Sequence, residues 1–209
     1  MKHAVIFDID GTLLNSAEED DRLYREAVAQ VLGEVRLRPA LSDYDPVTDA
    51  GILLQILRDN GIDEDARRIA EVKEAFFQRL ASFVDRQGPF VEIPGAKEAL
   101  GRLHRSDLYK VALATGGWRR SAQIKLETAG FDIASLPLAT SDDAIERPAI
   151  MELALAAIGE EVDSVTYFGD GLWDARACEI LGWKFRAVGP ALAGISSYDG
   201  EFAIKSTLT

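Results

Sequence analysis

Residues 3–16, His-Ala-Val-Ile-Phe-Asp-Ile-Asp-Gly-Thr-Leu-Leu-Asn-Ser, decide the fold of this chain. The stretch begins with four apolar residues, 4–7, which are typical of a strand buried on both faces of a parallel sheet. Two acids, Asp8 and Asp10, follow at the carboxyl end of this strand, and Gly11 lets the chain turn sharply there. In open α/β sheets, ligands bind just outside the carboxyl ends of the strands. The stretch therefore predicts a site for a divalent cation and a reacting group, against the alternative of a polar strand end without a function.

The composition is that of an ordinary globular protein. The chain has 209 residues, of which 47% are hydrophobic, and a net charge of −12 at pH 7. This length suffices for one large domain or for a core with a smaller insert. A nucleic-acid partner needs a basic face, so the acidic balance argues against one. A small phosphorylated substrate is compatible with the charge, because a few cations and one metal ion reverse the potential inside a cleft.

Cysteine content and hydropathy point to a cytoplasmic protein. Cys178 is the single cysteine, so no disulfide forms within the chain, and its apolar neighbours indicate a packed core thiol. The N-terminal apolar run is too short for a signal peptide, and no apolar run approaches the length of a membrane span. We expect no membrane partner. The sequence does not fix the oligomeric state, and a monomer is slightly favoured.

Between residues 16 and 88 the pattern is all helical. Ser16 is expected to cap a first helix that ends at Gly33, and further helices are expected over 52–59 and 64–86. The stretch 36–50 is rich in proline and aspartate and is expected to be a loop.

From residue 89 the pattern changes to alternating strands and helices. Strands are expected at 111–114, 165–168 and 184–188, and helices at 95–103, 121–129, 148–158 and 172–181. A short apolar stretch lies at 136–139, and residues 198–204 are expected to cover a sheet edge. This alternation implies a parallel sheet with right-handed crossovers. We predict an α/β fold, a Rossmann-like parallel-sheet core (1–15 and 89–209) with an inserted all-helical cap domain (16–88).

Two more strand ends carry polar groups that should reach the same rim of the sheet. Thr115, Gly116 and Gly117 offer a hydroxyl and bare amides at a helix start, which suits a phosphate; an ordinary strand-to-helix turn is the alternative. Asp170 ends a later strand, and Asp174 follows one helical turn on. As an isolated pair these two acids could equally mark a helix N-cap.

Together, Asp-x-Asp-Gly-Thr after an N-terminal strand, Thr115 and the late Gly-Asp-x-x-x-Asp resemble the haloacid dehalogenase superfamily over nearly the whole chain. The helical insert resembles the mobile cap of that superfamily. The resemblance implies that Asp8 is the nucleophile, forming an aspartyl-phosphate, and that Asp10 is the general acid and base. It also implies that Mg²⁺ is held by the carboxylates of Asp8 and Asp170 and the backbone carbonyl of Asp10, with support from Asp174. Thr115 and the amide of Gly116 would bind phosphate oxygens.

One position departs from the family pattern. Members usually carry a lysine before a proline, about thirty residues after the threonine, and this chain has Arg147-Pro148 there. Arginine keeps the charge and binds phosphate, so the phosphate-binding role passes to Arg147; a solvated charge at a helix start is the alternative. Asp10 favours phosphoryl transfer over dehalogenation, because halide displacement needs no proton for the leaving group.

These features predict a magnesium-dependent phosphatase of small phosphorylated metabolites. The alternatives are a phosphomutase of the β-phosphoglucomutase-like type and, less favoured, a non-catalytic binding protein or a dehalogenase. Substrate choice should lie in the cap, where the candidate contacts are Arg22, Arg36, Arg38, Tyr44, Asp45 and Thr48, each of which could instead be a surface residue. Trp118 and Trp173 are expected either to line the cleft or to pack in the core.

Overall fold

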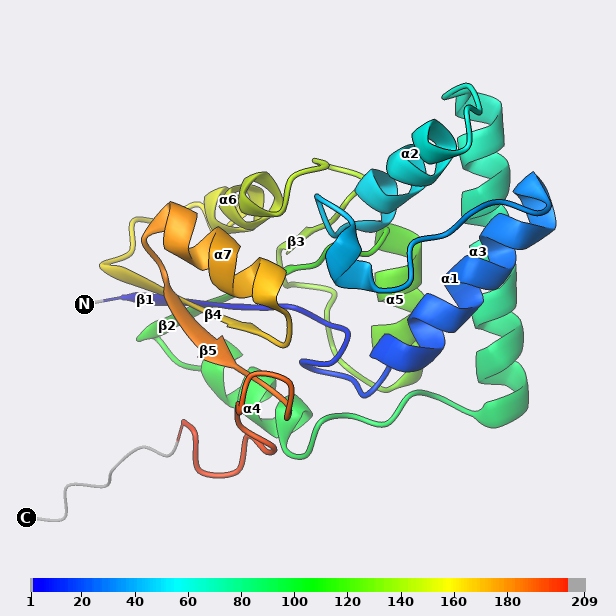
Figure 1. The fold of residues 1–209 in the computed structure, drawn as a ribbon. Coiled ribbons are helices and arrows are strands. Elements are labelled where there is room, and N and C mark those ends of the chain that lie inside the picture. Colours follow the sequence, from blue (N-terminus) through cyan, green and yellow to red (C-terminus); the bar gives the residue numbers. More distant parts are fainter. Residues whose placement is uncertain (1, 203–209) are drawn as a thin grey trace, which may run out of the picture.

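The computed structural model describes residues 2–202, and its centre is a five-stranded parallel sheet in the order β3-β2-β1-β4-β5 (Figure 1). The strands are β1 (His3–Phe7), β2 (Tyr109–Ala114), β3 (Leu138–Ala139), β4 (Ser164–Gly169) and β5 (Lys184–Ala187). The apolar run at the N-terminus takes the central place, as expected for a strand buried on both faces. Phe7 lies in register with Leu113 and Phe168, so the residues that follow these three strands emerge at one rim. The predicted α/β fold is confirmed.

Helices cover both faces of the sheet. They are α4 (Ala96–His104), α5 (Arg119–Thr128), α6 (Arg147–Ala157) and α7 (Leu172–Leu181). Successive residues of β1 point to opposite faces, so Ile6 packs in the cluster beneath α6 and α7, while Val5 and Phe7 join the larger cluster with α4 and α5. Pro148 lies in the first turn of α6, where its missing N–H costs nothing. Cys178 is buried, as predicted for a core thiol.

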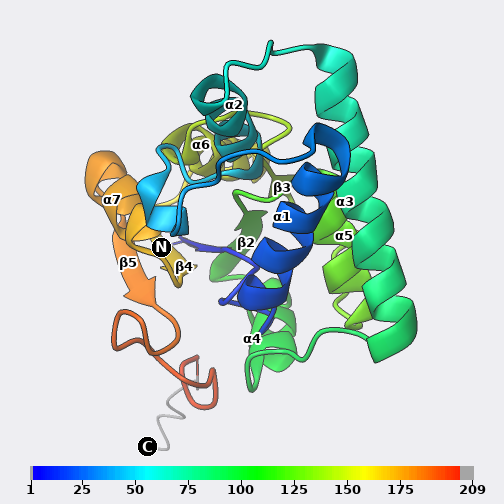
Figure 2. The ribbon, with the colours of Figure 1, turned by 45° about the vertical axis from the view of Figure 1, so that its right-hand side comes forward.

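The insert after β1 is helical, as predicted, and consists of α1 (Ala17–Leu32), α2 (Asp49–Asp59) and α3 (Ala66–Gln87), with a short 3₁₀ helix at Leu41–Asp43 (Figures 1 and 2). The predicted start of the second helix was wrong by three residues. Helix α2 begins at Asp49 because the Thr48 hydroxyl accepts a hydrogen bond from the Gly51 amide at 3.2 Å and caps the helix. The domain boundaries at 15/16 and 88/89 stay a prediction.

Aromatic side chains join the insert to the core. The Trp118 ring, at the start of α5, lies 5.4 Å from Tyr24 of α1 and 5.8 and 6.0 Å from Phe76 and Phe77 of α3, measured between ring centroids. Trp118 is 1% exposed and belongs to the same apolar cluster as Phe7. The insert therefore packs on the core through a continuous apolar contact. Of the two alternatives predicted for Trp118, lining the cleft or packing in the core, the structure shows packing in the core.

The end of the described chain packs on the sheet in a different place from the predicted one. Tyr198 is buried against Phe7 and Phe168 of the two inner strands, and its hydroxyl donates to the Thr12 carbonyl at 3.1 Å. It therefore covers a face of the sheet and not an edge. Residues 203 and 204 of the predicted 198–204 segment lie outside the described residues. No helix within residues 2–202 has the length and apolar character to cross a membrane.

Candidate active site

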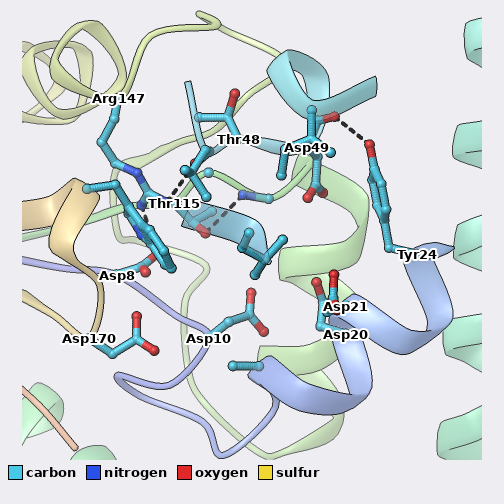
Figure 3. A pocket seen from close by; sticks show the side chains of 17 residues that line it. Asp8, Asp10, Asp20, Asp21, Tyr24, Thr48, Asp49, Thr115, Arg147 and Asp170 are labelled. Atoms are coloured by element: carbon cyan, nitrogen blue, oxygen red, sulfur yellow. Dashed lines mark hydrogen bonds and ion pairs between the residues drawn. The ribbon is translucent and has the colours of Figure 1, made fainter. Parts of the chain in front are cut away.

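The strand ends meet the insert around a cavity of about 120 Å³ (Figure 3). The core side of its wall contains the predicted residues Asp8, Asp10, Thr115, Gly116, Arg147 and Asp170. The seventh predicted residue, Asp174, is fully buried and lies 3.1 Å from Arg147. Residues from four separate parts of the sequence are thus brought together, because parallel strands end at the same rim.

Three carboxylates form the centre of the site. One oxygen each of Asp8, Asp170 and Asp174 lies within 4.8 Å of the others. Burial, and then the neighbouring charge of Asp174, raises the pKa of Asp170 to about 7, and burial raises the pKa of Asp8 well above its usual value. Oδ1 of Asp8 is buried and accepts no hydrogen bond from the described residues. Crowded, undersolvated carboxylate oxygens fit a hard divalent cation, which would relieve the repulsion that raises these pKa values.

Gly11 is needed for this crowding. Its φ is +73°, and a Cβ atom there would lie 2.1 Å from Oδ2 of Asp170. Only glycine combines the left-handed backbone conformation with this close approach. The turn at Gly11 that the sequence predicts therefore also makes room for the carboxylate of Asp170.

Arg147 extends from the start of α6 into the site and is only 7% exposed. Its Nη1 lies 3.1 Å from Asp174 and 3.6 Å from Asp8, and Nη2 donates to the carbonyl of Val47 in the insert at 3.2 Å. Its Nε and Nη1 donate no hydrogen bond to the described residues. The alternative of a solvated charge is therefore wrong, because the side chain is buried with unused donors beside the predicted nucleophile.

The loop after β2 presents backbone to the cavity. Thr115 is 2% exposed, and its hydroxyl oxygen accepts a hydrogen bond from the Gly117 amide at 3.2 Å. A Cβ atom on Gly116 would lie 2.6 Å from Nη2 of Arg147 and 3.0 Å from the Val47 carbonyl. The absence of a side chain thus lets Arg147 and the insert approach this loop closely.

Asp10 has a partner that the sequence analysis missed. Nζ of Lys125, from α5, lies 2.7 and 2.6 Å from the two oxygens of Asp10 and 2.6 Å from Oδ1 of Asp20 in α1. Ser16 is the N-cap residue of α1, as predicted, but its hydroxyl makes no cap bond and donates to Asp10 instead. Burial opposes the charge on Lys125, but Asp10 and Asp20 outweigh it, and the pKa of Lys125 lies above its ordinary value. The side chain of Asp10 is thus tied to both α5 and the insert.

A sequence signal for Lys125 exists. Ala122, Lys125, Leu126 and Ala129 follow the i, i+3, i+4, i+7 spacing of a buried helix face. A lysine at one of these positions is either exposed by a kink or paired in the interior. Lys125 is completely buried, so the second case holds.

The insert closes the other side of the cavity through residues 47–49. The Thr48 hydroxyl donates to the Ile145 carbonyl at 2.8 Å, the Asp49 amide donates to the Gly116 carbonyl at 2.8 Å, and the Tyr24 hydroxyl donates to the Asp49 carbonyl at 2.8 Å (Figure 3). Of the predicted cap contacts, only Thr48 is among the residues that line this cavity. Residues 48 and 49 of the insert therefore bond to two segments of the core, at Ile145 before α6 and at Gly116 in the loop after β2.

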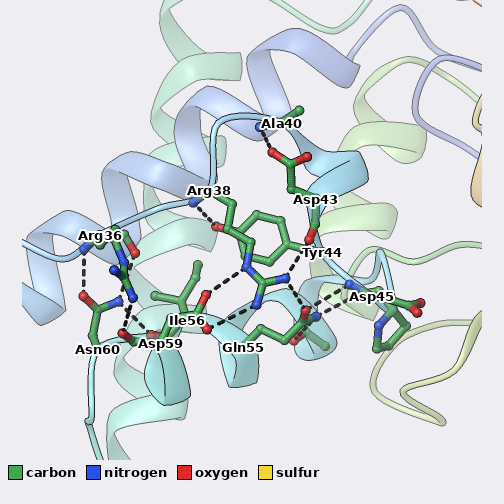
Figure 4. A network of polar contacts seen from close by, with 12 residues as sticks. Arg36, Arg38, Ala40, Asp43, Tyr44, Asp45, Gln55, Ile56, Asp59 and Asn60 are labelled. Atoms are coloured by element: carbon green, nitrogen blue, oxygen red, sulfur yellow. Dashed lines mark hydrogen bonds and ion pairs between the residues drawn. The ribbon is translucent and has the colours of Figure 1, made fainter.

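The other cap candidates have structural roles or lie on the surface. Arg38 bonds Asp59 and Gln55 at 2.8 and 3.0 Å, and its guanidinium lies 5.0 Å from the centroid of the Tyr44 ring (Figure 4). Arg36 donates to the Asp59 carbonyl at 3.0 Å, Arg22 pairs with Glu19 and Glu26, and Asp45 is exposed. Trp173 does line the cavity, and its buried Nε1 donates to none of the described residues.

The fold and the site together define an α/β enzyme with a helical insert above a carboxylate cluster at the carboxyl ends of its strands. Residues 2–182 match the family model described as haloacid dehalogenase-like hydrolase, so this chain belongs to that family. The family resemblance and the prediction of a hydrolase are thereby confirmed.

Individual relatives agree with this assignment. A phosphoglycolate phosphatase from Cereibacter sphaeroides is 31% identical over 191 residues, which are 87% of this chain and 82% of that protein. Among solved structures, a hydrolase from Pseudomonas syringae superposes with a TM-score of 0.71 at 24% identity, over 88% of this chain and 83% of that one. CbbY from Rhodobacter sphaeroides, in complex with phosphate, gives a TM-score of 0.67 at 21% identity over 97% and 91% of the two chains. These two structural similarities extend the agreement to the fold.

Proposed function

We propose that this protein is a magnesium-dependent phosphatase of small phosphorylated metabolites that works through an aspartyl-phosphate on Asp8. The observation that carries the proposal is the position of Asp8, which is buried beside the carboxylates of Asp170 and Asp174 and beside a buried arginine with unused donors. A carboxylate attacks a phosphate dianion only when the charges of both are neutralised. The named curated relative acts in the same class of reaction, since it is a phosphatase.

In this proposal Asp8 attacks phosphorus and the bond to the ester oxygen breaks. Asp10 protonates the departing oxygen and then takes a proton from the water that cleaves the aspartyl-phosphate, restoring Asp8 and releasing phosphate. Thr115, Gly116 and Arg147 bind the phosphoryl oxygens, with Arg147 in the place of the lysine that is usual in the family. These assignments agree with the residues that line the cavity.

Asp8, Asp170 and the backbone carbonyl of Asp10 would hold the Mg²⁺ ion, and Asp174 would support the site. When bound, this ion supplies charge neutralisation for the nucleophile and the phosphoryl group. Asp174 holds Arg147 at 3.1 Å and accepts a hydrogen bond from the Gly171 amide at 3.1 Å, which suits a supporting role.

We also propose that residues 16–88 act as a lid that excludes water during the first step. Hydrogen bonds from Thr48 and Asp49 to the core support a closed arrangement. Opening would separate these bonds, the aromatic contact at Trp118 and the ion pair between Lys125 and Asp20.

Hydrolysis of a panel of phosphate monoesters, with Mg²⁺ or with a chelator, tests the proposal. We expect phosphate release that requires Mg²⁺ and that falls by about 10⁴-fold or more in Asp8→Asn, because the amide is no nucleophile. Circular dichroism should show an unchanged fold. Absence of magnesium-dependent release from every ester would exclude a phosphatase, and an active Asp8→Asn variant would exclude Asp8 as the nucleophile.

A further inference from the structure

Lys125 is a buried cation to which the proposed chemistry gives no role. It lies on the buried face of α5 and is completely buried. Removing an ammonium group from water costs free energy, which close counter-charges offset. Lys125 has two of them, Asp10 and Asp20, and neither acid forms an ion pair with another cation within residues 2–202. These three side chains form one unit, which we call the Lys125 cluster.

The two oxygens of Asp10 accept different numbers of hydrogen bonds from the described residues. Oδ1 accepts one from Nζ of Lys125 at 2.7 Å and one from the Ser16 hydroxyl, whereas Oδ2 accepts only one, from Lys125 at 2.6 Å. A carboxylate oxygen has two acceptor sites, so Oδ1 is saturated and Oδ2 keeps one site free. The Asp10 side chain is 19% exposed and lines the cavity (Figure 3). The free site on Oδ2 is therefore the one left for a reacting proton.

Lys125 holds Asp10 in this orientation with all of its donors. Two contacts of its ammonium group go to Asp10, and the third goes to Oδ1 of Asp20 at 2.6 Å. An ammonium group has three donors, so none is left over. Its Nζ is anchored both by α5 and by the first turn of α1, and the Asp10 carboxylate cannot rotate without breaking a short contact.

The charge of the Lys125 cluster is compatible with an acid role for Asp10. One cation faces two carboxylates, which leaves one negative charge without a partner in a buried place. A proton on Asp10 removes that charge, so the ammonium group does not keep Asp10 ionised. Asp20 is needed for this balance, because a lone lysine would favour the bare carboxylate of Asp10.

We infer that Lys125 is a positioning residue that holds Asp10 so that its Oδ2 atom exchanges the proton with the substrate. This inference rests on the proposed phosphatase function and deepens it. In the first step the bond from Asp8 to phosphorus forms, the bond from phosphorus to the ester oxygen breaks, and the proton on Oδ2 passes to that oxygen. Lys125 touches none of the reacting atoms and acts through Asp10.

Two aryl esters of similar shape test the inference: p-nitrophenyl phosphate and phenyl phosphate, compared by kcat/KM in Mg²⁺. This constant covers the steps up to the departure of the alcohol, in which Asp10 gives its proton. Phenolate is as basic as a tyrosine side chain, with a pKa of about 10, and needs that proton, whereas p-nitrophenolate is a weaker base and leaves without it. The ratio of kcat/KM for p-nitrophenyl phosphate to that for phenyl phosphate therefore reports on the proton transfer.

In Lys125→Met we expect this ratio to rise by at least about tenfold, because the loss falls mainly on phenyl phosphate. Asp10→Asn should raise the ratio at least as much. The double variant Asp10→Asn/Lys125→Met should match Asp10→Asn within about twofold, because a residue that acts through Asp10 has no effect on the ratio once that acid is gone.

Leu126→Ala is the matched control, because Leu126 is also completely buried in α5. Loosening of the helix in this variant should lower kcat/KM for both esters alike and leave their ratio unchanged.

Failure to hydrolyse p-nitrophenyl phosphate would overturn the proposed function. Turnover of that ester with an unchanged ratio in Lys125→Met, or with a ratio in the double variant well above that of Asp10→Asn, would overturn the inference alone. Where Lys125→Met fails to fold, Lys125→Gln carries the test, since its amide keeps a donor in the interior. We expect a rise of about threefold there, and an unchanged ratio would overturn the inference.

Discussion

Two buried cations contact the two acids that we propose to be catalytic, Asp8 and Asp10, in different ways. Arg147 faces Asp8 and Asp174, both of which belong to the core, and its Nε and Nη1 donate no hydrogen bond to the described residues. Lys125 faces Asp10 in the core and Asp20 in the insert, with three contacts of 2.6 to 2.7 Å. An ammonium group has three donors, so Lys125 has none left for a ligand. Arg147 is equipped to bind an incoming anion, whereas Lys125 is equipped to hold a carboxylate in place.

The difference teaches that a buried charge beside an active site is not by itself a ligand-binding group. Unused donors distinguish a group that awaits a ligand from one that positions its neighbour. By this criterion Arg147 is a proposed binding residue and Lys125 a positioning residue, which acts through Asp10 and links it to the first turn of the insert.

The largest effect in this comparison is expected for Arg147→Met. Loss of the guanidinium removes the phosphate contact and leaves Asp8 and Asp174 without their cation, so kcat/KM should fall by about 10³-fold. Arg147→Lys should recover part of this loss, because the family usually has lysine there. Steady-state kinetics on p-nitrophenyl phosphate measure both variants, and equal activity of Arg147→Met and wild type would remove Arg147 from the proposed site.

A smaller effect on activity is expected for Lys125→Met. Asp10 loses its anchor, so kcat should fall by about 10- to 100-fold with little change in KM, because the phosphate contacts remain. Stability should fall by about 1 to 3 kcal/mol, since Asp10 and Asp20 are mostly buried and lose their counter-ion, while Asp10 keeps the hydrogen bond from Ser16. The double variant Lys125→Met/Asp20→Asn should regain part of the stability in urea unfolding, whereas Lys97→Met, at a half-exposed lysine, should change neither quantity. A rise in KM in place of a fall in kcat would assign Lys125 to substrate binding.

The smallest effect is expected for the variant Asp20→Asn, in which the free energy of unfolding should depend less steeply on pH. Burial, followed by the charge of Asp10, raises the pKa of Asp20 to about 6. The folded protein therefore keeps this proton above the pH at which the unfolded chain loses it, and the free energy of unfolding falls as the pH rises from about 4 to 6. This contribution is at most about 3 kcal/mol and is absent from Asp20→Asn. Urea unfolding in a chelator measures the slope. The neighbouring variant Glu19→Gln should keep the wild-type slope, and identical slopes in all three proteins would show that Asp20 titrates normally.

The sequence by itself determined the core of this protein. The apolar run before Asp8 predicted a strand buried on both faces of a parallel sheet, and three strand ends with polar residues predicted one rim, because parallel strands share a direction. The residues of these motifs do lie together, and the resemblance that they carry identified the family. Motifs of this kind can be recognised in the sequence because each consists of a strand and the turn that directly follows it.

Only the tertiary structure decided what faces these motifs. Lys125 stands more than a hundred residues from Asp10 and Asp20, and Asp49 reaches the Trp118 amide across the boundary between the insert and the core. Ser16 has the residue type and position of a helix cap, yet its hydroxyl makes no cap bond and donates to Asp10. Such contacts depend on how the insert packs over the sheet, and residue spacing along the sequence carries no record of that packing.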